Sequence, residues 1–503
     1  MNEMPTLMQD ASVSAAVAAA RIAQVAWAGR LPRQRLRPLA ELPAELCQHW
    51  EDFVALSPRP NASPSEVLSS EVMPLAEACR YAARVGKRAL APRTHSLRHA
   101  AWWMGRIGVR VTRQPWGTVL ILAPSNYPLL LPGVQIVQAL AAGNAVVVKP
   151  APGCTAILQR FVDSCAVVGI PPGLIQVLDT PVAAGQAAIA AGVDKVVLTG
   201  SVDSGRSVLS QLAQTLTPAT LELSGCDAVF VTEQADLQRV ARCVVYGLLL
   251  NGGATCIAPR RVFVTPLHRE RLGELIREEL QQRAAAEMQL PRAVRSRIAQ
   301  AAQQAVAEGA EVLCGSLDFA DRQPASMPAL VLHKVQPHMA IAQGDFFGPV
   351  LSLISVPNMA AAIEADRLCP YALGASVFGP TVMAEHWASQ IQAGCVVIND
   401  VIVPTADPRV AFGGGRHSGW GVTRGWEGLV AMSRPQVMCI RRGRWLPHLD
   451  QRQAHNSRLL VGLLQMSHAP RLTQRLAAAG QVLSALLRPP AAPDQPPPTT
   501  DPS

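Results

Sequence analysis

One cysteine stands in a setting suited to covalent chemistry. Cys256 ends the run NGGATC, whose small residues follow a long apolar stretch and precede a strand-like run. Such a loop can present a thiol at a cleft. An ordinary thiol has a pKa of about 8.5 and is only a few per cent thiolate at neutral pH, so neighbouring groups have to activate it. Cys256 is therefore a candidate nucleophile, whereas most of the other ten cysteines lie in helical or strand patterns.

Two polar residues upstream could complete such a site. Glu222 lies inside the apolar run TLELSG, where burial raises a carboxyl pKa and suits it to act as a general base. Asn126 lies in LAPSNYPLLLP, and its amide could donate to a developing oxyanion. Each also has a purely structural interpretation, as a strand-end ion pair for Glu222 and as a turn residue for Asn126. Taken one at a time, these residues leave both interpretations open.

Two strand ends could bind a cofactor. The run KVVLTG leads into SVDSGRSVL, so a strand ending in Gly200 and Ser201 opens a helix whose free N–H groups can meet a phosphate. Lys149 ends NAVVVKP, at the carboxyl edge where open α/β sheets bind ligands. The G-x-G-x-x-G fingerprint is missing after the predicted strands. An ordinary turn and a solvated lysine therefore remain the alternatives.

The elements that must position these residues fall into two series. Residues 10–110 are predicted to be mostly helical. From residue 117, short β-branched runs alternate with helical patterns, and a second such series extends from DAVFVT to CVVIND. Alternation of this kind is typical of βαβ crossovers and a mainly parallel sheet. The sequence therefore predicts an α/β protein of two domains with a cleft between them.

Composition excludes several classes of function. The formal charge is +9, but basic residues are spread along the chain and only 4% of residues are aromatic, so nucleic-acid binding is not expected. The eleven cysteines form no C-x-x-C pair, which favours reduced thiols and a cytoplasmic protein. No signal peptide or membrane span is predicted. His95 and His99 have helical ligand spacing but no third partner, so no metal site is predicted.

The chain ends in a segment of different character. Residues 458–488 are basic and rich in leucine, and residues 489–503 are rich in proline and predicted to be disordered. The leucine-rich stretch could lie on an anionic membrane surface as amphipathic helices. A packing or oligomerisation arm is the alternative.

Seven motifs, taken in order, resemble those of the aldehyde dehydrogenase superfamily, and the CIAP context is most similar to its class 3 branch, which acts on fatty or aromatic aldehydes. The resemblance spans roughly residues 60–440. The motifs are PSNYP (124–128), KPAP (149–152), LTGSVDSG (198–205), ELSG (222–225), GGATCIAP (252–259), DFFGPV (345–350) and AFGGGRHSGWG (411–421).

The resemblance implies a role for each candidate. Cys256 attacks the aldehyde to form a thiohemiacetal, and Asn126 with the Cys256 N–H holds the oxyanion. Hydride passes to NAD or NADP, and a water deprotonated by Glu222 hydrolyses the thioester to the acid. The implied cofactor contacts are Lys149 for the adenosine ribose, the turn Thr199, Gly200, Ser201 and Gly205 for the pyrophosphate, and Asp345 with Phe347 for the nicotinamide ribose.

The resemblance also implies an organisation. A helical layer and a doubly wound, Rossmann-like NAD(P)-binding domain are expected over 1–225, and a catalytic domain over 226–398. A return segment and a small oligomerisation arm are expected over 399–440, and a basic helical extension with a disordered tail over 441–503. A homodimer acting on a small aldehyde, of lipophilic or aromatic type, is implied, and peripheral membrane contact through 458–488 is a further hypothesis.

The chain departs from the family pattern at several positions. Ser125 replaces a usual Trp, Ala254 a Gln, Ser224 a Gly, Ala411 a Pro, and Asp345 the longer Glu. Pro152 replaces a Glu that often selects NAD by accepting from the ribose 2′-hydroxyl, so NADP is predicted to be tolerated. These departures motivate an alternative function, a catalytically impaired scaffold or binding protein with the same fold.

Overall fold

The computed structural model describes residues 3–59, 62–101, 107–283, 288–320, 326–442 and 454–487. The chain divides into a first unit, Met1–Ala91 with Arg113–Pro435, and a second unit, Pro92–Thr112 with Gln436–Ser503. The predicted disordered tail, 489–503, lies outside the described residues.

A largely parallel sheet organises the N-terminal half of the first unit. Its strand order is β19-β7-β6-β3-β4-β5, and β19 alone runs antiparallel to its neighbour. The four central parallel strands are apolar and nearly fully buried, as expected where helices cover both faces. The strands are β3 (Thr118–Leu122), β4 (Ala145–Lys149), β5 (Ile175–Val177), β6 (Lys195–Gly200), β7 (Ala219–Leu223) and β19 (Gly419–Trp420).

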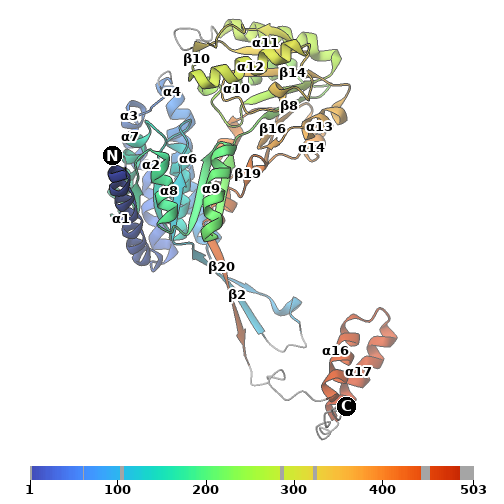
Figure 1. The fold of residues 1–503 in the computed structure, drawn as a ribbon. Helices are drawn as coiled ribbons and strands as arrows, with labels where there is room; N and C mark the ends of the chain where they lie inside the picture. Colours follow the sequence, from blue (N-terminus) through green and yellow to red (C-terminus); the bar gives the residue numbers. More distant parts are fainter. Residues whose placement is uncertain are drawn as a thin grey trace, which may run out of the picture. The chain divides into compact units, whose positions relative to one another are not determined.

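Helices wrap this sheet, as Figure 1 shows in blue and green. The helix α6 is buried along its whole length, because its sequence is apolar or small apart from Gln135 and Gln138, whose amides donate to Thr199 and Gly425. The covering helices are α1 (Glu3–Ala28), α2 (Pro32–Gln48), α5 (Met73–Ala89), α6 (Leu130–Ala142), α7 (Thr155–Val167), α8 (Val182–Ala190) and α9 (Val202–Thr215).

One of the covering helices, α1, is long and strongly apolar. No membrane span was predicted, yet Ala11–Ala28 of α1 is long and apolar enough to cross a membrane by length and composition. In the structure a hydrogen bond and an ion pair connect this helix to other residues of the first unit. The Trp27 indole Nε1 donates to the Leu140 carbonyl at 2.8 Å, and Arg21 pairs with Asp194 at 3.2 Å. The helix therefore packs here as a covering helix.

A second sheet organises the C-terminal half of the first unit, in the order β11-β13-β14-β9-β8-β16-β17. All neighbouring strands are parallel except the β11–β13 pair. The strands are β8 (Asp227–Val231), β9 (Pro259–Val264), β11 (Glu311–Cys314), β13 (Leu330–His333), β14 (Val350–Ser355), β16 (Gly374–Phe378) and β17 (Cys395–Ile398).

Separate apolar cores lie on the two faces of the second sheet. One contains side chains of α10 and α11, and the other contains side chains of α12, α13 and α14. These helices are α10 (Leu237–Leu249), α11 (Pro266–Gln282), α12 (Arg292–Ala307), α13 (Met359–Arg367) and α14 (Thr381–Ala388). The predicted α/β architecture is thus present in both halves.

The second unit contains a small sheet and a helical hairpin. The sheet has the order β1-β2-β20, with β1 (Arg93–His95), β2 (Ile107–Pro115) and β20 (Ser433–Arg441). The prediction that residues 10–110 are mostly helical is therefore wrong at its end, where β1 and the start of β2 lie. His95 ends a strand and does not share a helix with His99. The hairpin consists of α16 (Ala454–His468) and α17 (Leu472–Leu487), side by side in Figure 1.

Candidate active site

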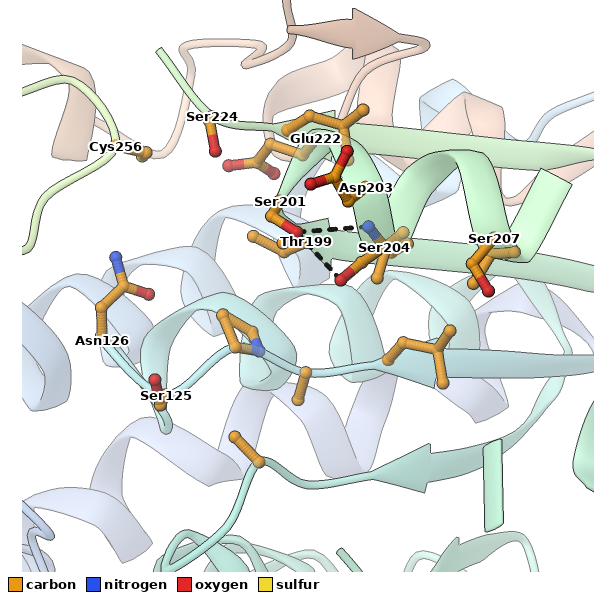
Figure 2. Close-up of a pocket in the computed structure, with 18 of the residues that line it drawn as sticks. Ser125, Asn126, Thr199, Ser201, Asp203, Ser204, Ser207, Glu222, Ser224 and Cys256 are labelled. Carbon is orange, nitrogen blue, oxygen red and sulfur yellow. Dashed lines mark hydrogen bonds between the residues drawn. The ribbon is translucent and has the colours of Figure 1, made fainter. Parts of the chain in front are cut away.

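A cavity of about 640 Å³ lies in the first unit, at the carboxyl ends of strands in the first sheet. Nine of the ten predicted site residues line it, together with Ser204 and Ser207 of α9. Figure 2 shows Cys256 and Asn126 at one end of this pocket and the serines of α9 towards the other. The nine are Asn126, Lys149, Thr199, Gly200, Ser201, Glu222, Cys256, Asp345 and Phe347.

Gly205 is the exception. It lies in α9 outside the pocket lining, and a Cβ there would stand 2.8 Å from the Leu223 side chain. The missing side chain lets α9 pack closely on β7 and so positions the helix N-terminus. Gly205 thus acts on the pocket through packing, without contacting its contents.

The loop that carries Cys256 depends on backbone conformations that glycine adopts easily. After α10 the chain makes a short turn with φ of 49° at Asn251, 65° at Gly252 and 71° at Gly253. A Cβ on Gly253 would lie 2.5 Å from the carbonyl carbon of Gly348, so two backbones meet there. The NGG run therefore brings the thiol loop against the loop that follows Asp345.

Asn126 is tied to the same loop. Its Nδ2 donates to the Ala254 carbonyl at 3.1 Å, and the Asn251 Nδ2 donates to the Asn126 carbonyl at 2.9 Å. An amide nitrogen carries two N–H groups, and the bond to Ala254 uses one. Asn126 is thus held beside the nucleophile loop with donor capacity for a substrate oxygen.

The surroundings of Cys256 favour the protonated thiol. Burial raises its pKa above the ordinary value, and the charges of Glu222, Asp227 and Asp345 raise it further. Arg424 opposes them. Because a thiol is a weak nucleophile, attack on a carbonyl requires that the proton leave as the bond forms.

Glu222 has the properties of a general base. It is buried in β7, and its Oε2 accepts from the Thr423 hydroxyl at 2.9 Å. Its Oε1 is also buried and has no hydrogen-bond partner among the described residues. Burial raises its pKa, while Arg424 and the Thr423 hydroxyl lower it. One carboxylate oxygen is fixed and the other is available to a water.

The opposite end of the pocket fits a phosphate-bearing cofactor. Ser201 caps α9, its hydroxyl accepting from the Ser204 N–H at 3.2 Å, so the positive end of this helix lies at the lining. Lys149 is half-buried, and its Nζ donates to the Thr180 carbonyl at 2.8 Å. The Thr199 hydroxyl accepts from Gln135 at 3.1 Å.

Asp345 supplies a further sign that a polar ligand belongs there. Its Oδ1 is buried without a hydrogen-bond partner in the described part of the chain. Burial raises its pKa, while Arg260 and the Ser224 hydroxyl lower it. A buried carboxylate oxygen without a donor is costly, and a sugar hydroxyl would satisfy it. The residues present therefore fit a dinucleotide.

Two arginines were not predicted to belong to the site. Arg260 lies fully buried in β9, where it donates to the carbonyls of Gly348 and Gly253, each at 2.6 Å, and of Thr255 at 3.5 Å. It thereby joins the nucleophile loop to the Asp345 loop. Two consecutive arginines inside PRRVFV, otherwise an apolar strand, are the sequence signal that could have identified it.

Arg424 is the second. Its guanidinium lies 4.4 Å from the centre of the Phe412 ring, and its Nη1 donates to the Thr405 carbonyl at 3.0 Å. Its charge lowers the pKa of both Glu222 and Cys256. Arg424 immediately precedes α15 (Gly425–Ala431). Its backbone φ is 58°, which is uncommon for a residue other than glycine.

Comparison with known proteins identifies the family. The sequence model described as the aldehyde dehydrogenase family matches residues 3–438. The chain belongs to the aldehyde dehydrogenase family. The predicted superfamily and fold class are confirmed, and the chain is an aldehyde dehydrogenase.

Individual relatives have low sequence identity to this chain, but each match covers most of both chains. The 4,4'-diapolycopene aldehyde oxidase of Methylomonas sp is 28% identical over 394 residues, covering 76% of this chain and 74% of that protein. A Mycobacterium tuberculosis aldehyde dehydrogenase complexed with NAD+ has a TM-score of 0.79 and 27% identity, covering 87% of this chain and 92% of that one. The NADP-dependent glyceraldehyde-3-phosphate dehydrogenase from Bacillus halodurans C-125, complexed with NADP, has a TM-score of 0.78 and 27% sequence identity. The match covers 86% of this chain and 91% of that one.

The bridging role of Arg260 can be tested by substitution. We expect R260M to lower kcat/KM at least about tenfold, because three carbonyls lose a charged donor. R260K is the matched control for charge, since lysine keeps the cation but has no planar fork. The rate of Cys256 alkylation by iodoacetamide and the KM for the cofactor should both change. Wild-type values in R260M would show that the two loops hold each other without it.

The charge of Arg424 should set the pH dependence. Glu222 and Cys256 act in deprotonated form and both have raised pKa values, so kcat/KM is expected to increase from neutral to alkaline pH. Removing the cation raises both pKa values further. The profile of R424M should therefore move to higher pH, with the largest loss at neutral pH, while R424K stays near wild type. A shift to lower pH would contradict this electrostatic role.

Proposed function

We propose that this enzyme oxidises a lipophilic or aromatic aldehyde to the carboxylic acid through a covalent adduct on Cys256. The reaction class follows from the family, which uses NAD or NADP. The observation that carries the residue assignment is that Cys256, Glu222 and Asn126 line one end of a cavity whose other end fits a dinucleotide.

The residues act in sequence. The Cys256 sulfur attacks the carbonyl carbon as its proton passes to solvent, and the Asn126 amide with the Cys256 N–H donates to the oxygen that becomes negative. The nicotinamide of NAD or NADP, which Asp345, Phe347 and the start of α9 would help to hold, would supply the hydride acceptor that oxidation of the thiohemiacetal to a thioester requires. A water that gives its proton to Glu222 Oε1 then hydrolyses the thioester and frees the thiol.

The departures from the family pattern do not favour the scaffold alternative. At Ala254 the backbone carbonyl binds Asn126, so this contact needs no side chain at that position. Ser224 presents a hydroxyl to the shorter Asp345, and its own carbonyl accepts from Ser418 at 2.8 Å. The residues proposed for catalysis and cofactor binding therefore keep these contacts in the presence of Ala254, Ser224 and Asp345.

The substrate class rests on two supports. One is the CIAP context, on which the class 3 assignment depends. The other is the name of the Methylomonas relative, which specifies a diapolycopene aldehyde.

Substitution of the catalytic pair tests the mechanism. We expect C256A to lose turnover with every aldehyde, because no nucleophile remains. In E222Q the adduct and hydride transfer should still occur but hydrolysis should stall, giving a burst of reduced cofactor equal to the enzyme concentration. Stopped-flow absorbance of the reduced nicotinamide distinguishes the two. Steady turnover by either variant would remove the assignment.

We propose that NADP is accepted alongside NAD. Pro152 is exposed, and no carboxylate stands at this position, where the family often has Glu. Lys149 lines the pocket together with the uncharged residues Ala151, Val182, Gly185 and Gln186, while Asp203 of α9 lines it as well. Lys149 therefore offers a positive charge to a 2′-phosphate, and the usual Glu is not there to repel it.

Restoring the usual acid tests this preference. P152E should lower kcat/KM for NADP at least about tenfold and leave the value for NAD close to wild type, because a carboxylate repels the phosphate but accepts from a hydroxyl. P152Q is the neutral control. A wild-type preference for NAD above about a hundredfold in kcat/KM would refute the proposal.

We further propose a homodimer in the cytoplasm. The small sheet of the second unit exposes apolar side chains on β20, with Val437 57%, Met438 36% and Ile440 38% exposed, and a second copy of the chain could cover them. All eleven cysteines are free thiols, which suits a reducing compartment.

A further inference from the structure

The C-terminal hairpin carries a row of exposed leucines. Leu472, Leu476, Leu483 and Leu487 of α17 are 71%, 66%, 59% and 75% exposed. Their spacing of four, seven and four residues places them on one face of the helix. We call these four residues the leucine stripe. Leu460, Val461 and Leu464 of α16 are exposed as well, at 56%, 49% and 61%.

The hairpin does not need the leucine stripe for its own packing. The two helices meet through small residues: Ala478 is buried, and a Cβ on Gly462 would lie 2.8 Å from the Val482 side chain. The close contact of α16 with α17 therefore uses a different face. Large apolar side chains left exposed in a row indicate a surface that something else covers.

The charge of the hairpin indicates what kind of surface covers the leucine stripe. From Ala454 to Leu487 the sequence contains Arg458, Arg471 and Arg475 and neither Asp nor Glu. Arg471 and Arg475 are exposed and lie in the same turns as Leu472 and Leu476. Two hairpins packed stripe to stripe would bring like charges together, whereas an anionic lipid surface would attract them.

We propose that the leucine stripe binds the surface of an anionic lipid bilayer. The helices have 15 and 16 residues, which is too short to span a bilayer, so they lie in its interface. The leucines enter the acyl region while the flanking arginines reach the headgroups. A lipophilic aldehyde is concentrated in the same layer, but vesicle binding can be measured without any assumption about the substrate.

Sedimentation with vesicles tests the proposal on the full-length enzyme. Wild type should sediment with vesicles of equimolar phosphatidylglycerol and phosphatidylcholine, and only weakly with phosphatidylcholine alone or at high salt. L476E/L483E should bind the anionic vesicles at least about tenfold less, because two charges enter the stripe. Turnover of a short, water-soluble aldehyde should be unchanged in this variant and shows that the enzyme is folded.

A matched control separates the leucine stripe from net charge. Gln474 and Gln481 are exposed on the opposite face of α17, so Q474E/Q481E adds the same two charges away from the stripe. This control should keep most of the vesicle binding. Absence of wild-type binding, or equal binding by L476E/L483E, overturns the proposal. A changed oligomeric state of L476E/L483E in lipid-free buffer, measured by analytical ultracentrifugation, would assign the stripe to a second copy of the chain and also overturn it.

Discussion

The active site depends on the close contact of two loops from the second sheet. Gly253 and Gly348 approach so closely that a Cβ on the first would lie 2.5 Å from the second, and the Arg260 guanidinium donates to the carbonyls of both. Cys256 follows one loop and Asp345 precedes the other, so one contact positions the nucleophile relative to the cofactor end. One backbone carbonyl of each loop accepts a hydrogen bond from the buried Arg260 guanidinium. This shared donor restricts the movement of either loop without the other.

This arrangement concentrates negative charge where the thiol must react. Glu222, Asp227 and Asp345 all raise the pKa of Cys256, and burial does so more strongly. Arg424 provides partial compensation at the pocket. The balance favours the neutral thiol, so the proton has to leave as the sulfur attacks. The rate then depends on how well the base and the oxyanion donors are aligned.

The sequence predicted the parts of the site that end a recognisable run. Lys149, Thr199 and Glu222 each lie near the carboxyl end of an apolar strand, and parallel strands bring such ends to one edge. Their placement followed from this pattern, while their roles remain predictions. Arg260 could not be placed, because its partner Gly348 is 88 residues away and only the fold joins them. β1 was missed because its three residues are exposed and lack any apolar alternation. β2 does alternate at its start, with Ile107, Val109 and Val111 separated by Gly108 and Arg110, and the prediction of a helical layer up to residue 110 overlooked this signal.

Residues far apart in the sequence can meet in the fold, so a single departure from the family pattern is misleading when it is considered alone. Asp345 is one methylene shorter than the usual Glu, and Ser224 replaces a Gly more than a hundred residues earlier. In the structure the Ser224 hydroxyl acts on the Asp345 carboxyl and lowers its pKa, so the two substitutions meet at one point. Judged separately, each weakens the case for an active enzyme. Together they place a carboxyl group at the pocket that Ser224 partly stabilises in its charged form and whose Oδ1 has no partner among the described residues, so that it can accept from a sugar hydroxyl.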